Sequence, residues 1–364
     1  MSRPAPSIHG RGAQSGAVPT RFGLATREVG GDWRDHVATL DGTPPPLRTT
    51  VIEERPKSIL SFNQSPDIAF DRSVNAYRGC EHGCIYCFAR PTHAFHDLSP
   101  GLDFETRLFA KPDAPDLLRA TLARPKYVPR PIAMGTNTDP YQPIEARYRI
   151  TRQLLEVCLD ARHPVTITTK SDRVLRDLDL LEEMARQRLV AVAISVTTLD
   201  PQLSGKLEPR ASAPVKRLAA LGRLAEAGVP THCSVAPVIP AITDHFMEEI
   251  VTRAGALGVA SAGWIALRLP HEVAPLFREW LAVHFPERAG KVMSIVRSIR
   301  ANAHGGRDND PDFFTRMRPT GVWAELFRAR FRLACRKAGI GEVRFELDCS
   351  RFRPPATDGQ LRLL

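Results

Sequence analysis

The sequence has no run of about 18 to 20 uninterrupted apolar residues, the length that a membrane-spanning helix requires. Its first residues, MSRPAPSIHGRGAQSG, lack the apolar segment of a secretory signal. The seven cysteines are an odd number, and the chain contains no second C-x-x-C pair. These absences argue against a membrane protein, a disulfide framework and a zinc site built from two ligand pairs. We therefore expect a cytoplasmic protein.

Three of the cysteines lie close together in NAYRGCEHGCIYCFAR, where Cys80, Cys84 and Cys87 have the spacing C-x3-C-x2-C. Gly79 and Gly83 permit tight backbone bends, so three sulfurs can converge. Soft thiolates select zinc or an iron-sulfur cluster, and a [4Fe-4S] cube held by three cysteines keeps one iron without a protein ligand. A zinc site of three cysteines and His82 stays open as an alternative, although structural zinc sites usually combine two separated ligand pairs.

This loop, with the aromatic Tyr86 before the third cysteine, resembles that of the radical S-adenosylmethionine (SAM) enzymes. The resemblance implies two cofactors, a [4Fe-4S] cluster and SAM, with the free iron binding the amino and carboxylate groups of SAM. One electron from the reduced cluster then cleaves SAM to a 5'-deoxyadenosyl radical, which abstracts hydrogen from a substrate. A reducing electron donor such as flavodoxin or ferredoxin is the implied protein partner.

Six short apolar runs alternate with amphipathic helical stretches, which predicts an α/β fold with a parallel sheet. The resemblance sharpens this to a partial (β/α)6 TIM-type barrel. We expect the strands at 73–77, 131–134, 165–169, 190–195, 232–235 and 264–267. Helices are expected at 147–161 and 172–188, among others.

Composition divides the chain into four parts. Residues 1–47 are rich in Pro, Gly, Ser and Arg, and we expect them to be disordered; residues 48–70 should form an arm packed on the core at 71–300. We expect residues 301–364 to form a helical C-terminal extension. This end of the chain is basic, since about +7 of the net charge of +10 lies from Lys291 onward. A helix near 321–338 carries Arg328, Arg332 and Arg336 on one face, which suits either solvent or nucleic acid.

Polar residues follow the expected second strand, from Gly135 to Glu145. Together with Thr169-Lys170 and Val235-Ala236-Pro237, this rim resembles the spore photoproduct lyase branch of the radical SAM enzymes over about residues 71–300. In such barrels the active residues collect at the carboxyl ends of the strands. The cofactor-binding residues that the resemblance implies are Tyr86, Asn137, Asp139, Lys170, Ser195, Glu208, Arg217 and Ala236.

Each of these residues has a distinct expected role. Lys170 and Ser195 match positions that contact the carboxylate and other polar groups of SAM's methionine, and a cation suits a carboxylate. Tyr86 and Ala236 match contacts to adenine. Glu208, Arg210 and Arg217 lie in KLEPRASAPVKRL, and Arg210 or Arg217 is expected to bind an anionic group of the substrate. For each of these residues the alternative to a binding role is a structural one, either as a solvated loop residue or as part of the core.

The substrate itself stays open between nucleic acid, a peptide and a small molecule, and a non-enzymatic metal-binding module is a further alternative. Thr136 aligns with the cysteine that returns hydrogen in the lyases. A hydroxyl holds its hydrogen too strongly for that role, so we do not expect this protein to repair the spore photoproduct.

Overall fold

The computed structural model describes residues 8, 10–16, 48–302, 305–341 and 345–356. Its main sheet has seven strands in the order β10-β9-β8-β7-β6-β3-β2. All neighbours in it are parallel except β2 and β3. The strands are β2 (Leu60–Phe62), β3 (Arg72–Val74), β6 (Ile132–Met134), β7 (Val165–Thr169), β8 (Val190–Ser195), β9 (Thr231–Val238) and β10 (Ser261–Ala266).

The six parallel strands confirm the α/β prediction of a partial barrel, and each falls where an apolar run occurs in the sequence. The side chains of β8 are buried or nearly so on both faces, whereas those of β7 alternate, with Val165, Ile167 and Thr169 buried and Thr168 exposed. The antiparallel strand β2 was not predicted. It lies at one edge of the sheet and β10 at the other, so the barrel stays open between them.

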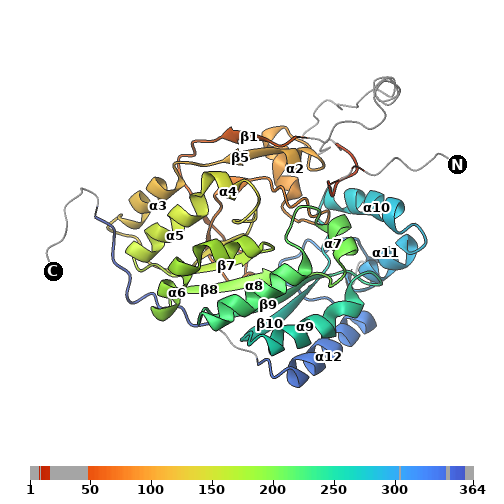
Figure 1. Ribbon diagram of the computed structural model, residues 1–364. Coiled ribbons are helices and arrows are strands. Elements are labelled where there is room, and N and C mark those ends of the chain that lie inside the picture. Colours follow the sequence, from red (N-terminus) through yellow and green to blue (C-terminus); the bar gives the residue numbers. More distant parts are fainter. Residues whose placement is uncertain (1–7, 9, 17–47, 303–304, 342–344, 357–364) are drawn as a thin grey trace.

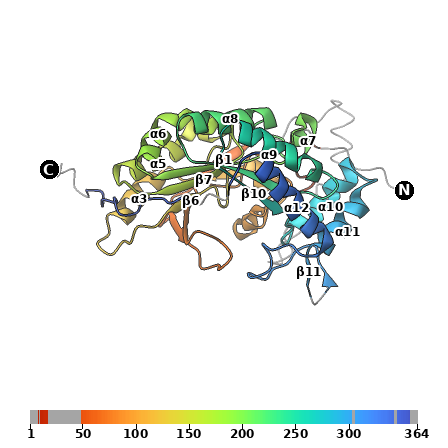
Figure 2. The same ribbon diagram turned by 90° about the horizontal axis from the view of Figure 1, so that it is seen from below.

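Helices cover one face of this sheet (Figures 1 and 2). Helices form where the spacing of apolar residues predicts, with Leu154, Leu181 and Leu221 buried toward the strands. The bounds differ, because the helix predicted at 147–161 is interrupted at Arg149 and the one predicted at 172–188 begins as a 3-10 helix. This layer consists of α3 (Ala114–Leu122), α5 (Ile150–Asp160), α6 (Leu178–Arg186), α8 (Pro214–Glu226) and α9 (Met247–Ala256). The short helices α4 (Glu145–Tyr148) and η3 (Asp172–Asp177) follow β6 and β7.

A second, three-stranded sheet has the order β1-β5-β4 and lies beside the cysteine loop. It consists of β1 (Thr50–Glu53), β4 (Tyr77–Arg78) and β5 (Arg107–Ala110). The predicted arm therefore divides its residues between this sheet and the edge strand β2. Helices η2 (Arg90–His96) and α2 (Asp103–Thr106) connect the cysteine loop to β5.

The remaining helices of the described residues are α7 (Pro201–Leu207), the short η4 (Asp244–Phe246), α10 (Val273–His284), α11 (Ala289–Ser298) and α12 (Gly321–Lys337). Helix α12 confirms the helix predicted near 321–338: its Phe327 and Phe331 are buried, and Arg330 joins it to Glu248 of α9. A short hairpin of β11 (Ala301–Asn302) and β12 (Gly305–Gly306) precedes it. Within the described part of the chain, no helix has the length and apolar character needed to cross a bilayer.

Candidate active site

The cysteine loop begins just after β4 and is held open by its own backbone. Gly79 and Gly83 have φ angles of +70° and +66°, which favour glycine. The Gly83 amide donates to the Cys80 carbonyl at 3.2 Å, and the Cys87 amide donates to the Cys84 carbonyl at 3.1 Å. Cys80 and Cys84 are buried and Cys87 is half-buried. The loop thus holds Cys80, Cys84 and Cys87 in one short, tightly bent segment.

The arrangement of donors around the loop does not suit a mononuclear metal. Among the residues that the structure describes, no three His, Cys, Asp or Glu side chains converge on a single ion. His82 instead places its Nδ1 3.3 Å from Asp139 Oδ2. In a [4Fe-4S] cube each cysteine binds a different iron, which requires a wider spread of sulfurs. Three cysteines without His82, which is held by Asp139, are a donor set that fits a [4Fe-4S] cluster with one iron left free.

A buried ion pair contacts the backbone of the cysteine loop. The Arg90 and Glu105 side chains are both fully buried and joined at 2.5 Å. Arg90 also donates to the carbonyl oxygens of Gly83 at 3.0 Å and Cys84 at 2.9 Å. Because these carbonyls belong to the loop itself, the guanidinium fixes its path. Sequence reasoning missed both residues, since a charged pair 15 positions apart has no local pattern.

Part of the segment that we predicted to be disordered packs against this loop (Figure 1). Arg11, Ala13 and Gln14 are buried, and the amides of Gly12 and Ala13 donate to the Glu105 carboxylate at 3.0 and 2.8 Å. The prediction of disorder is therefore wrong for residues 10–16, because Glu105 offers acceptors that offset the entropy of ordering them. Most of 1–47 lies outside the described residues.

Gly12 allows the closest approach between this segment and the loop. A Cβ atom there would lie 1.8 Å from the Gly83 carbonyl oxygen. We expect Gly12→Val to detach residues 10–16, destabilise the protein by about 1 to 3 kcal/mol as overpacking does, and speed the loss of the cluster in air several-fold. Thermal unfolding and the decay of cluster absorbance measure these effects.

The matched control is Gly16→Val, because nothing lies within 4 Å of a Cβ at Gly16. We expect this variant to resemble the unmodified protein. Equal stability and equal cluster lifetime in the Gly12 and Gly16 variants would contradict the packing role of Gly12.

Asp139 connects the polar rim to the loop and to the end of β7. Its Oδ1 accepts from Thr169 Oγ1 at 2.7 Å, and its Oδ2 accepts from the Lys170 amide at 2.7 Å. Burial alone would raise its pKa, but His82 and these hydrogen bonds lower the pKa to about 2. The Asp139 carboxylate is thus ionised and accepts hydrogen bonds from the protein itself. It therefore fixes the polar rim against the end of β7.

A second buried network lies on the other side of the cysteines. Glu208 accepts hydrogen bonds from the Tyr86 hydroxyl and from Arg217, and from Thr197 Oγ1 at 2.7 Å. Burial opposes ionisation, but Arg217, Lys170 and the hydrogen bonds lower the pKa of Glu208 to about 2. Thr197 also donates to the Ala236 carbonyl at 3.0 Å. The network therefore connects Tyr86, which precedes Cys87, to the ends of β8 and β9 through hydrogen bonds.

Lys170 is the cation that faces this network. Its Nζ lies 5.7 Å from the centre of the Tyr86 ring, within cation-π range. The charge of Lys170 also lowers the pKa of Cys84, although burial dominates and raises it. A half-buried ammonium at the end of a strand, next to the three cysteines, is a suitable partner for a carboxylate.

The comparisons with known proteins agree with this geometry. The family model described as the radical SAM superfamily matches residues 74–254, which run from the end of β3 into α9. The chain belongs to the radical SAM superfamily. Members of this family use a [4Fe-4S] cluster and SAM, which supports an enzyme of this class.

Relatives extend the likeness beyond the matched domain. The uncharacterized protein Rv2578c of Mycobacterium tuberculosis is 36% identical over 242 residues, which cover 65% of this chain and 71% of the relative. The uncharacterized protein MJ0683 of Methanocaldococcus jannaschii is 30% identical over 171 residues, covering 47% of this chain and 61% of the relative. Both relatives are described as uncharacterized, so their names indicate no substrate.

Solved structures of spore photoproduct lyase share the fold. The lyase complexed with dinucleoside spore photoproduct has a TM-score of 0.52 at 15% identity, and the alignment covers 79% of each chain. A mutant of the lyase has a TM-score of 0.54 at 14% identity, again over 79% of each chain. At this identity the likeness shows a common fold and carries no residue roles.

For a radical SAM enzyme, the geometry divides the predicted cofactor-binding residues into two groups. Lys170, Ser195 and Ala236 lie at or near the carboxyl ends of β7, β8 and β9, and Tyr86 lies in the cysteine loop beside them. Ser195 is buried and its carbonyl accepts from Arg217 at 3.1 Å. Asn137 is exposed on the rim, and its backbone N–H donates to Asn75 Oδ1 at 3.0 Å.

The other group does not contact a ligand directly. We expected Arg210 or Arg217 to bind an anionic group of the substrate. The Arg217 side chain is fully buried and donates to Glu208, the Ser212 carbonyl and the Ser195 carbonyl, so no surface of its guanidinium remains for a ligand. The prediction is therefore wrong for Arg217, and it stays a prediction for Arg210, whose side chain is 38% exposed. Glu208 and Asp139 are likewise occupied by protein donors and act through Tyr86 and the Lys170 backbone.

Proposed function

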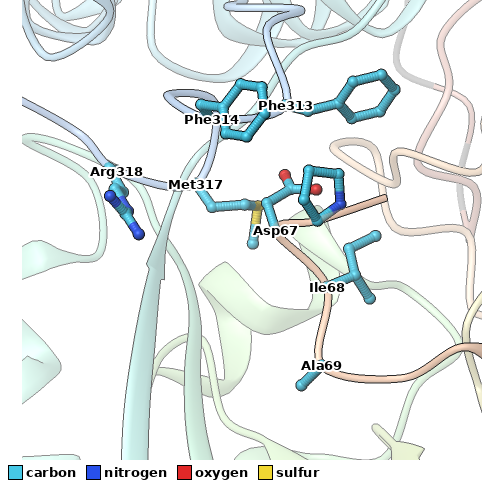
Figure 3. A pocket seen from close by; sticks show the side chains of 8 residues that line it. Asp67, Ile68, Ala69, Phe313, Phe314, Met317 and Arg318 are labelled. Carbon is cyan, nitrogen blue, oxygen red and sulfur yellow. The ribbon is translucent and has the colours of Figure 1, made fainter. Parts of the chain in front are cut away.

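We propose that this radical SAM enzyme abstracts hydrogen from a nucleic-acid substrate that enters at the open edge of the barrel. The observation that carries this proposal is a pocket of about 300 Å³ lined by the β2–β3 loop and the segment before α12 (Figure 3). One wall contains Ile68 and Ala69, and the other contains Phe313, Phe314 and Met317.

The pocket lies between segments that follow the edge strand β2 and precede α12. Its walls follow β2 and β12, and both project from the face of the sheet opposite the main helices (Figure 2). Arg316 joins the walls through Asp67, with Nη2 2.8 Å from Oδ1. Met317 contacts Arg268, which comes two residues after the edge strand β10. The pocket is therefore beside the opening of the barrel.

The chemistry of the pocket suits a base and its phosphate. Phe313 and Phe314 are 47% and 71% exposed, and adjacent exposed rings of this kind are stacking surfaces for unpaired bases. Arg318 lines the same pocket, and the positive charges of Arg268 and Arg316 are close enough to affect each other. The net charge of +10 favours a polyanion. The lyase that shares this fold has been solved with a dinucleoside.

When bound, the cluster and SAM supply the 5'-deoxyadenosyl radical that removes a hydrogen atom. In this proposal Cys80, Cys84 and Cys87 hold the cluster, Lys170 binds the SAM carboxylate, and Tyr86 with the Ala236 backbone orients the adenine. Glu208 and Arg217 fix Tyr86. The buried pairs beneath the loop exclude water from it.

Repair of the spore photoproduct is not part of this proposal. Thr136 occupies the rim position where a thiol would be needed, and its hydroxyl lies 3.0 Å from Asn75 Nδ2. An O–H bond is a poor hydrogen-atom donor to carbon, so another donor or another resolution of the product radical is required.

Removing the two rings together, in Phe313→Ala/Phe314→Ala, tests the substrate assignment. We expect binding of a fluorescent single-stranded oligonucleotide to weaken by about 1 to 3 kcal/mol per base lost from stacking. Fluorescence anisotropy at low salt measures the affinity, and reductive SAM cleavage in the absence of substrate should persist. Phe95→Ala, which removes another exposed ring (68%) on η2, is the matched control.

Two results would contradict the proposal. One is no oligonucleotide affinity at low ionic strength with folded, cluster-loaded protein. The other is equal affinity in the double variant and in the Phe95 control. Loss of affinity for a hydrophobic peptide in place of the oligonucleotide would favour a peptide substrate.

A further inference from the structure

A second concave surface lies outside the pocket for substrate, at the outer side of the cluster loop. It encloses about 340 Å³ and is lined by His82 of that loop, by Arg173 at the start of η3 and by Arg210 and Lys216 around the start of α8. We call these four residues and the space between them the basic recess.

The charge that the recess presents to solvent is positive. Arg173 and Lys216 are exposed, and Arg173 uses one nitrogen to donate to the Pro143 carbonyl at 3.0 Å. Arg210 is partly exposed and pairs with the buried Glu81 at 3.1 Å. Among the lining residues, Asp172 is acidic, and its Oδ1 accepts from Ser212 Oγ at 2.6 Å. The three cations therefore outnumber the carboxylates of Asp172 and Glu81 by one. Within the described residues, the two exposed cations, Arg173 and Lys216, have no carboxylate partner in an ion pair.

The recess is in direct contact with the cluster loop. His82 lies between Cys80 and Cys84 and is part of the recess lining, and the Arg210 amide donates to the His82 carbonyl at 3.3 Å. The imidazole in turn reaches Asp139, which holds the end of β7. A molecule that fills the recess thus touches the backbone that carries the cluster ligands.

The recess and the substrate pocket open on different sides of the sheet. Helix α8 and η3, which carry Lys216 and Arg173, belong to the helical layer (Figure 2). The substrate pocket is built from loops that project from the other face. A partner at the recess therefore approaches the cluster loop without competing with the substrate.

We propose that the basic recess docks a small acidic protein that carries a low-potential one-electron centre and reduces the cluster. One electron passes from the carrier, which is oxidised, to the cluster, which is reduced, and no bond or proton changes place. Complementary charge speeds the encounter of such transient partners. Val215, 68% exposed beside Lys216, adds an apolar contact at the rim, which suits a protein partner more than a phosphate backbone.

This proposal rests on the assignment to the radical SAM superfamily and not on the nucleic-acid substrate. The test uses the full chain with its reconstituted cluster and the variant Arg173→Glu/Lys216→Glu. Arg210 is left unchanged, because removing it would leave the buried Glu81 without its partner. Lys291→Glu, an exposed lysine near the start of α11, is the matched control.

Two measurements are made with flavodoxin as the probe. Its affinity for the enzyme is measured by calorimetry, and the formation of 5'-deoxyadenosine is measured with either reduced flavodoxin or dithionite as the electron source. We expect the double variant to lose at least about tenfold in flavodoxin affinity at low salt, and high salt to remove the difference. Flavodoxin-driven turnover should fall by a similar factor while dithionite-driven turnover is unchanged.

Unchanged flavodoxin affinity and turnover in the double variant would overturn the proposal, as would an equal loss in the Lys291 control. Loss of oligonucleotide affinity with flavodoxin binding intact would assign the recess to nucleic acid instead. If dithionite-driven cleavage fails in the unmodified enzyme, the radical SAM function itself is contradicted. If it fails only in the double variant, the substitutions have damaged the cluster site, which overturns a role confined to docking.

Discussion

Alanine at Cys80, Cys84 or Cys87 is expected to abolish SAM cleavage and to reduce the iron content of the reconstituted protein from about four atoms to a small fraction of that. Each cysteine holds one iron of the cube, and the loop offers no replacement ligand, since His82 is engaged by Asp139 at 3.3 Å. Iron and sulfide analysis, electron paramagnetic resonance and chromatography of methionine and 5'-deoxyadenosine measure these effects.

Cys349→Ser is the control for this series, because Cys349 is a half-buried cysteine outside the cluster loop. We expect it to keep both iron and activity. Stoichiometric zinc in protein purified under strict anaerobiosis, together with no SAM cleavage after reconstitution, would instead support the zinc alternative.

The largest effect on stability is expected from Arg217→Met. Both side chains of the Arg217–Glu208 pair are fully buried. Removing the cation leaves a buried carboxylate without its charge partner, which typically destabilises a protein by about 3 to 5 kcal/mol. Denaturant unfolding measures the change in the free energy of unfolding. The double variant Glu208→Gln/Arg217→Met should recover part of the loss, because no unpaired charge remains.

The exposed pair Arg223–Glu226 provides the control, with side chains 62% and 64% exposed. Arg223→Met should change the stability by less than about 1 kcal/mol. A similar small loss at Arg217 would show that the buried pair does not hold the site together.

The pair also predicts how stability depends on pH. The folded pKa of Glu208, about 2, is below its ordinary value of 4.5. The unfolded chain therefore binds this proton more readily, so the stabilisation is fully present above about pH 4.5 and is lost as the pH falls toward 2. Arg217→Met should flatten the acid limb of the stability curve in this range.

Local sequence determined the cluster loop and the strands that carry it. The three cysteines fall within eight residues, so their spacing alone brings the sulfurs together and identifies the chemistry. The apolar runs at 165–169 and 190–195 became β7 and β8 with the predicted bounds. The cysteine spacing and the apolar runs both depend on residues that are neighbours in the chain. They can therefore be recognised from the sequence without knowing the fold. Lys170 was likewise placed correctly at the end of β7, because a strand end is a local feature.

Only the tertiary structure decided which charged residues are free to act. Arg217 and Lys170 look alike as cations in the sequence, yet one is fully buried against Glu208 and the other is half-buried over Tyr86. Residues 10–16 have the composition of a disordered segment, but Glu105, more than 90 positions away, supplies acceptors for their amides. Burial and long-range hydrogen bonds depend on which surfaces meet in the folded chain, and composition and spacing carry no information about that.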